Sequence, residues 1–183
     1  MEKRLAFRYG RAVALYRAVL FVLAFVALAL LVALAPSVPL LPVLLATGLL
    51  IAAAFVFAFS PLLTDHWLTR SRLILRQGWY FRIIVPFADI ESIRPSEDTA
   101  RSRAPLGIHR PLGQATLYVM GGRTGIVVLR LRTPRRFWQS FGLHADEIVF
   151  DVSDRDAFLR AADERRGLLA PVQSDRTDAD LRY

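Results

Sequence analysis

Residues 18–64 read AVLFVLAFVALALLVALAPSVPLLPVLLATGLLIAAAFVFAFSPLLT, a run of 47 residues without Asp, Glu, Lys, Arg or His. A helix rises about 1.5 Å per residue and a bilayer core is about 30 Å thick, so one crossing takes roughly 20 residues. The run therefore supplies two crossings and a turn between them. It excludes a purely soluble globular protein and an intrinsically disordered one.

The turn is marked by Pro36, Pro39 and Pro42, because proline breaks helices. We predict membrane-spanning helices over residues 13–35 and 43–63. No ionisable group lies deep in either predicted span, which argues against a transporter or a channel.

Gly48 and Ala52 form a pair of small residues four positions apart in the second predicted helix. Such pairs let helices approach closely. We expect this pair to pack the two helices of the hairpin together. The alternative is an interface with a membrane-protein partner or with a second copy of the chain.

Basic residues flank the apolar run on both sides, whereas the turn has none. Residues 1–17 carry a net charge of +4, and Arg70, Arg72 and Arg76 follow the second helix. The positive-inside rule therefore predicts a cell-membrane protein with two spans and both termini in the cytoplasm. A cleaved signal peptide ending at Ala33-Leu34-Ala35 is the competing interpretation. Pro36 directly after that site and the second apolar segment argue against it.

The absence of cysteine and the length of the chain limit the kinds of site and domain that this protein can have. The chain has 183 residues, a formal net charge of +8 and no Cys. The absence of cysteine excludes disulfides, thiolate nucleophiles and Cys-based metal sites. The stretch after residue 64 is long enough for one small domain with its own core.

Alternating apolar and polar residues after residue 64 predict a mainly β domain. The turn residues Gln77-Gly78 are expected to join two strands, over residues 68–76 and 79–85, in a hairpin. Gly121-Gly122 are expected to join the strands over residues 116–120 and 125–133 in the same way. We predict strands over residues 68–76, 79–85, 90–93, 116–120, 125–133 and 147–152. Long loops are expected over residues 94–115 and 134–145.

One amphipathic helix follows the last predicted strand. Ser153 is expected to cap it, Phe158 lies on its apolar stripe and Gly167 ends it. This order predicts a β-sandwich or partly open barrel with a C-terminal capping helix, preceded by the transmembrane hairpin. We divide the chain into an N-terminal and hairpin region (1–64), a β domain (65–167) and a polar, disordered tail (168–183).

Three segments carry a resemblance to a known family. They are TRSRLILRQG (69–78), IVPFADIESI (84–93) and DEIVFDVSDRDAF (146–158). Together they resemble the bacterial pleckstrin-homology-like (PH-like) domain family, in which a short transmembrane hairpin often precedes the domain. The resemblance covers about residues 8–167, and the long loop over residues 94–115 departs from the family pattern.

The resemblance implies a PH-like β-sandwich with a capping helix. It brings no catalytic residues and no phosphoinositide pocket to this chain. PH-like domains in general bind membranes, peptides or partner proteins, so the resemblance favours a binding role without choosing the ligand.

The sequence contains no recognisable group of catalytic or metal-binding residues. His66, His109 and His144 have no partner at metal-ligand spacing, and we expect His66 to lie at the surface or the membrane interface. Gly121–Gly125 lacks the phosphate-loop lysine, so we interpret it as a turn. Asp89 and Glu91 are expected to be solvated or paired with arginines and not to form a catalytic carboxylate pair. The sequence therefore predicts a non-enzymatic protein without metal or cofactor.

Charge divides the β domain and the tail. Residues 65–136 have a net charge of +8 and residues 137–183 a net charge of −4. Each Arg near an anionic leaflet contributes about 1 kcal/mol to binding. The candidate residues for contact with lipid or a partner are Arg70, Arg72, Arg76, Arg82, Arg101, Arg103 and Arg110. The alternative is that these arginines form the solvent face of ordinary strands, balanced by the acidic tail, or serve only to set the membrane topology. Nucleic acid is not an expected partner, because no stacking motif or helix-turn-helix accompanies these residues.

The sequence leaves two main functions open. The first is a membrane-anchored binding module that docks on anionic lipid head groups of the inner leaflet or on a partner protein. The second is a subunit or assembly factor of a larger membrane complex, with the hairpin supplying the main contact.

Overall fold

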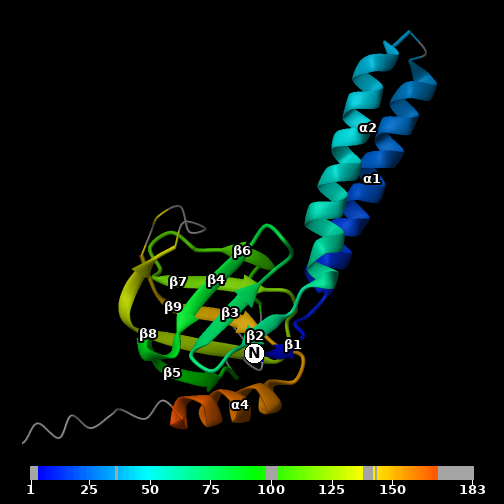
Figure 1. Ribbon diagram of the computed structural model, residues 1–183. Coiled ribbons are helices and arrows are strands. Elements are labelled where there is room, and N and C mark those ends of the chain that lie inside the picture. Colours follow the sequence, from blue (N-terminus) through cyan, green and yellow to red (C-terminus); the bar gives the residue numbers. More distant parts are fainter. Residues whose placement is uncertain (1–3, 36, 98–102, 138–141, 143, 169–183) are drawn as a thin grey trace, which may run out of the picture.

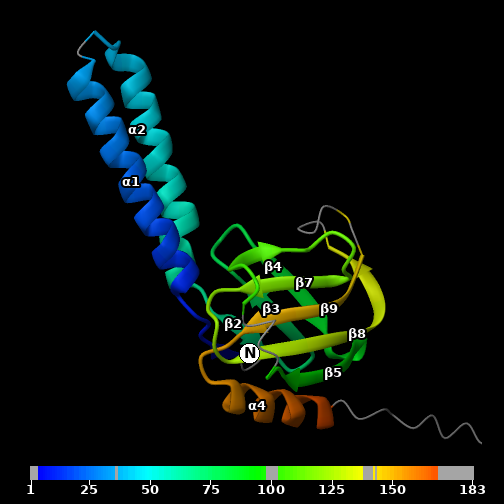
Figure 2. The ribbon, with the colours of Figure 1, turned by 180° about the vertical axis from the view of Figure 1, so that it is seen from behind.

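The computed structural model describes residues 4–35, 37–97, 103–137, 142 and 144–168. Two long helices form a hairpin that projects from one side of a β-rich domain, and a C-terminal helix lies on the side away from the hairpin (Figures 1 and 2). The predicted tail falls almost wholly outside the described residues, which end at Leu168.

The hairpin consists of α1 (Ala12–Leu34) and α2 (Leu40–Ala54), and α2 continues as a π-helical turn (Phe55–Phe59) and a 3-10 turn (Ser60–Leu63). Both helical stretches are long and apolar enough to cross a membrane. Their large side chains face outward, as Leu49 does with 73% of its surface exposed. Two long apolar helices at the predicted places are confirmed, and their crossing of a membrane stays a prediction.

The predicted turn of the hairpin is longer than the observed one. Pro42 lies in the first turn of α2 and not before it. The first turn of a helix tolerates proline because its N–H groups have no partner within the helix.

The first sheet has four strands in the order β1-β2-β3-β4. Strand β1 (Leu5–Phe7) was not expected, and it pairs antiparallel with β2 (His66–Leu68). Strands β3 (Arg72–Arg76) and β4 (Arg82–Pro86) form the predicted hairpin. The single strand predicted over residues 68–76 is therefore two strands, because the chain turns at Thr69, whose backbone N–H bonds the carbonyl of Arg72 at 2.9 Å.

The second sheet has five strands in the order β5-β8-β9-β7-β6. The strands are β5 (Ile90–Pro95), β6 (Gly107–His109), β7 (Thr116–Met120), β8 (Ile126–Arg136) and β9 (His144–Asp151). The predicted hairpin at Gly121-Gly122 is wrong, because β9 lies between β7 and β8 and runs parallel to β7. The Gly-Gly pair makes a bend, but the two strands it joins are separated by a third.

Other parts of the strand prediction also differ from the structure. Strand β6 falls within the loop predicted over residues 94–115, where Gly107 pairs with Met120. Strands β8 and β9 both extend into the loop predicted over residues 134–145. Pro134 lies within β8 at an irregularity in the β8–β9 pairing. Proline has no backbone N–H, and at this irregularity no hydrogen bond between the strands requires one.

Helix α4 (Arg155–Gly167) confirms the predicted C-terminal helix, but its cap differs. The side chain of Asp154, not of Ser153, accepts the bond from the Ala157 N–H at 3.0 Å. Phe158 and Ala162 are buried against the sheets.

One hydrophobic core joins the two sheets and α4. The inner residues of β3 and β4, such as Leu75 and Val85, share it with Leu129 and Phe150 of the second sheet. Phe158 of α4 contacts Phe150 edge-on, with ring centroids 5.5 Å apart. The two sheets therefore form a single domain closed at one end by the helix.

A buried carboxylate fixes this domain to the base of the hairpin. Asp151, at the end of β9, has no exposed surface. Its two oxygens accept bonds from the N–H groups of Gly10 at 2.6 Å and Gly121 at 2.5 Å. Gly10 precedes α1, and the carbonyl of Gly121 in turn accepts a bond from the N–H of Val13 at 3.0 Å.

Tyr9 makes a second connection on the same side. Its hydroxyl donates to the carbonyl of Pro61 at 2.7 Å and lies 2.9 Å from the Thr64 hydroxyl. The N–H of Gly78, in the β3–β4 turn, donates to the Thr64 hydroxyl at 2.9 Å. Residues before α1, after α2 and within the first sheet therefore meet at one place.

Two aromatic contacts complete the junction. Tyr80 packs against Phe57 with ring centroids 5.1 Å apart, and its hydroxyl accepts a bond from the guanidinium of Arg17 in α1. Trp79 contacts Phe55 with centroids 5.3 Å apart. The β3–β4 turn therefore lies directly against the hairpin.

We predict that Gly10→Ala destabilises the protein by about 1–3 kcal/mol, the range typical of overpacking. A Cβ at this position would collide with the backbone of Gly122 and with the Asp151 carboxylate. The thermal unfolding of the full-length chain in detergent measures the effect. Gly167→Ala is the control, since a Cβ there meets nothing within 4 Å. Equal unfolding midpoints for the two variants would contradict this account of the junction.

Candidate functional site

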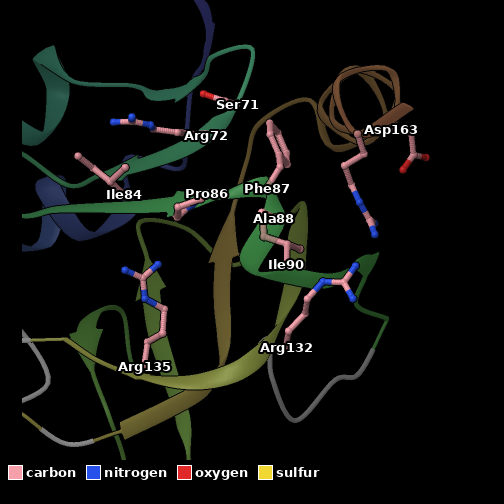
Figure 3. Close-up of a pocket in the computed structure, with 11 residues that line it drawn as sticks. Ser71, Arg72, Ile84, Pro86, Phe87, Ala88, Ile90, Arg132, Arg135 and Asp163 are labelled. Atoms are coloured by element: carbon pink, nitrogen blue, oxygen red, sulfur yellow. The ribbon is translucent and has the colours of Figure 1, made fainter. Parts of the chain in front are cut away.

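A groove of about 890 Å³ opens between the end of β4, the start of β5, strand β8 and helix α4. Figure 3 shows the side chains that line it, with apolar residues on the floor and arginines around them. The apolar lining comes from Ile84, Pro86, Phe87, Ala88 and Ile90. The charged lining comes from Arg72, Arg132, Arg135, Arg166 and Asp163.

Local chain geometry brings the lining together. Pro86 ends β4, and a short 3-10 turn (Phe87–Asp89) then carries the chain from the first sheet to the second. The side chain of Phe87 is buried in the core, which anchors this turn. Strand β8 is long enough, at 11 residues, to pass under the turn and place Arg132 and Arg135 beside it.

Two of the four arginines have partners within the domain. Arg135 forms an ion pair with Asp89 at 2.6 Å, and Arg166 donates to the carbonyl of Glu91 at 3.0 Å. Among the described residues, Arg72 and Arg132 have no acidic group within 4 Å. The groove therefore has an excess of positive charge, with Asp163 as its one acidic lining residue.

The expected pairing of Asp89 and Glu91 with arginines is confirmed. Glu91 contacts Arg130 at 3.2 Å, and both side chains are about half exposed. Exposed pairs of this kind contribute little to stability, typically below about 1 kcal/mol. Each pair cancels one negative and one positive charge, so the pairs leave the uncompensated charges of Arg72 and Arg132 unchanged.

The groove and the hairpin lie at opposite ends of the first sheet. Strand β3 starts at Arg72 in the groove and ends beside the turn at Gly78 that contacts the hairpin. Four strand steps separate Arg72 from Arg76, a distance of about 13 Å. The groove also borders the C-terminal half of α4, at Asp163 and Arg166, and this end of the helix is the one farther from the hairpin (Figures 1 and 2).

The sequence-predicted arginines do not form one patch. Arg72 lines the groove, whereas Arg76 and Arg82 are paired across strands at the other end of β3 and β4. Arg76 lies over the ring of Trp67, 4.6 Å from its centroid. Arg70 is exposed at the turn before β3.

The remaining predicted arginines lie elsewhere. Arg103 is exposed before β6, and Arg110 donates to the carbonyl of His144 at 3.0 Å. Arg101 lies outside the described residues. Sequence reasoning did not select Arg132, Arg135 or Arg166, although the alternation in β8 does place Arg130 and Arg132 on its polar face.

Gly48 and Ala52 lie on the exposed surface of α2. A Cβ at Gly48 would meet nothing within 4 Å, so among the described residues this glycine makes no close contact with α1. The pair faces outward from the hairpin instead.

The buried ionisable groups serve the fold. Burial raises the pKa of Asp151, while the N–H groups of Gly121, Gly10 and Gly122 act in the opposite direction. His66 is only 1% exposed, so its expected position at the surface or the membrane interface is wrong. It stacks on Tyr9 with ring centroids 4.8 Å apart, and its Nδ1 accepts the N–H of Arg76 at 3.1 Å.

Within the described ranges, no group of three or more His, Asp or Glu residues could hold a metal ion. His109 stacks on Tyr118 with centroids 4.8 Å apart, and burial lowers its pKa. His144 lies 3.2 Å from Arg136, measured from its Nε2 to the arginine Nε. The three histidines therefore lie in three different environments.

Comparison with known proteins gives no match: no protein-family model, no curated protein and no solved structure is similar to this chain. The resemblance to the PH-like family therefore stays a prediction.

His66 makes stability depend on pH. Complete burial lowers its pKa from 6.5 to about 3, so the folded protein keeps the ring neutral. Between these values the unfolded chain takes up a proton that the folded chain does not. We predict that the contribution of His66 to the free energy of unfolding falls as pH is lowered from 6.5 towards 3, by at most about 1.4 kcal/mol per pH unit.

Denaturant unfolding at several pH values measures this slope. His66→Asn is the matched variant, because its amide oxygen can still accept the Arg76 N–H but does not titrate. The variant should lose stability overall and show a shallower slope. A slope identical to that of the original chain would assign the pH dependence to other groups.

Proposed function

We propose that this protein is a non-enzymatic, membrane-anchored binding module, in which a PH-like domain holds the arginine-lined groove towards the cytoplasm for a partner protein. The observation that carries the proposal is the groove itself, at the end of the domain opposite the hairpin junction. No cofactor is part of it.

Two features support the membrane topology. Strand β1 precedes the hairpin and β2 follows it, and the two strands pair, so both ends of the hairpin lie on the same side of any membrane it crosses. The basic residues of the N-terminal segment, with a net charge of +4 over residues 1–17, favour the cytoplasmic side.

The fold is compatible with the resemblance to PH-like domains. Two sheets share one core, and a C-terminal helix closes it. The resemblance implies two sheets around one core and a closing helix, whereas the parallel pairing of β7 with β9 was not expected. Fold analogy alone does not choose between binding and catalysis.

A partner protein fits the groove better than lipid of the protein's own bilayer. Asp151, Tyr9 and Tyr80 connect the domain to the hairpin at several points, so the domain has little freedom to turn. Arg72 and Arg132 then stay at the far end of the domain from the hairpin. Arg76 and Arg82, near the junction, are better placed to approach anionic head groups.

A pull-down of the tagged full-length chain from gently solubilised native membranes tests the proposal. We expect a stoichiometric protein partner whose recovery drops with Arg72→Glu/Arg132→Glu. The control Arg94→Glu/Arg123→Glu has the same net charge and changes two exposed arginines outside the groove, so recovery should persist. A chain recovered alone, or with anionic lipid only, would contradict the proposal.

The second candidate function is a subunit or assembly factor of a membrane complex that is held through the hairpin. The outward position of Gly48 favours it, since a second helix could approach there. In the same pull-down, Gly48→Leu would then remove the partner and the groove variant would not. The substitution leaves the hairpin intact, because the added side chain meets no neighbour within 4 Å of its Cβ.

A further inference from the structure

We infer that the groove takes an extended acidic segment of a partner protein, with an apolar side chain on the floor and carboxylates on Arg72 and Arg132. This inference rests on the proposed function and names the chemistry of its partner. It comes from the charge, the shape and the strand edge of the groove.

Charge selects an acidic ligand. Asp89 already neutralises Arg135, and Arg166 bonds a backbone carbonyl. Arg72 and Arg132 have no acidic group within 4 Å in the described part of the chain, so their charges are uncompensated and available to a ligand. Arg166 also keeps its charge, because a carbonyl is neutral. A guanidinium binds a carboxylate through two parallel hydrogen bonds, which gives direction as well as affinity.

Shape selects an elongated ligand over a compact anion. The arginines come from β3, β8 and α4, and the apolar floor lies between them (Figure 3). Arg72 and Arg132 are both exposed, so neither belongs to a buried pocket of converging donors that would enclose a single phosphate. A ligand that bridges them lies against the apolar lining around Pro86 and Ala88, which favours a chain with an apolar side chain between acidic ones (Figure 3).

The strand edge selects an extended chain. Strand β4 is the last strand of its sheet, and in the described residues it pairs with β3 alone. Ile84, in the middle of β4, is 36% exposed and lines the groove. An extended peptide can run beside such an edge, where its backbone finds hydrogen-bonding groups and its side chains reach the groove.

A display selection tests the inference. The full-length chain is embedded in nanodiscs of zwitterionic phosphatidylcholine, so that no anionic lipid competes. A random peptide library is selected on this protein and counter-selected on the Arg72→Glu/Arg132→Glu variant in identical nanodiscs. We expect enriched peptides with Asp or Glu on both sides of an aliphatic or aromatic residue.

Fluorescence anisotropy then compares the best peptide across variants. The groove variant should bind it roughly 10- to 100-fold more weakly, because charge-assisted bonds are lost. Affinity should also fall with added salt. The Arg94→Glu/Arg123→Glu control should bind like the original chain, and Ile84→Ser should weaken binding without removing the salt dependence. Matching unfolding midpoints show that each variant folds.

Several outcomes would overturn the inference. They are no enrichment over the counter-selection, enriched peptides without acidic residues, and equal affinity for the groove variant. Binding of inorganic phosphate or of anionic vesicles that needs the same two arginines, without any peptide enrichment, would make the groove a simple anion site. A partner recovered by pull-down through these arginines, but lacking an acidic segment, would leave the proposed function standing and refute this inference alone.

Discussion

The buried carboxylate of Asp151 is the interaction on which the arrangement of this protein depends. It bonds the N–H groups of Gly10 and Gly121 and so ties together the end of β9, the segment that enters α1 and the bend after β7. A carboxylate without exposed surface needs such partners, because an unpaired buried charge is strongly unfavourable. The glycines are required because side chains at these positions would collide with their neighbours.

This junction determines what the domain can reach. With the β3–β4 turn against the hairpin, the opposite end of the first sheet, and the groove with it, is held away from the hairpin. In the proposed function, the membrane anchor keeps the domain in a thin layer at the membrane surface. The effective concentration of the domain for a partner in the same layer then reaches about mM. Weak contacts with a shallow, exposed groove are then sufficient, and its orientation decides which partners can bind.

The sequence predicts the hairpin and most of the strands for clear physical reasons. A charge-free run of 47 residues has few alternatives to two apolar helices, and alternation in β4 and in the middle of β8 reports a buried and an exposed face. Strand β1 was missed because three residues are too few for a periodic signal, and it forms by pairing with β2. The Gly-Gly bend was misassigned because a local turn signal cannot reveal that β9 inserts between β7 and β8.

The groove could be predicted only in part. Charge patterning gave Arg72 and the basic character of residues 65–136, but Arg166 lies 94 positions further along the chain than Arg72. Arg72 and Arg166 line the same groove only because α4 packs beside β5 and β8. The same limit applies to His66, whose burial follows from β1 and Tyr9 covering it and from no feature of its own neighbourhood in sequence.

The rigidity of the junction is the central claim, and a distance measurement between two spin labels tests it most directly. The chain has no cysteine, so Ser37→Cys at the hairpin turn and Arg160→Cys on α4 label the full-length protein at two exposed sites only. In nanodiscs, double electron–electron resonance should give one narrow distance distribution, which Asp151→Ala broadens. A broad distribution in the chain with Asp151 intact would show a freely hinged domain and contradict the account.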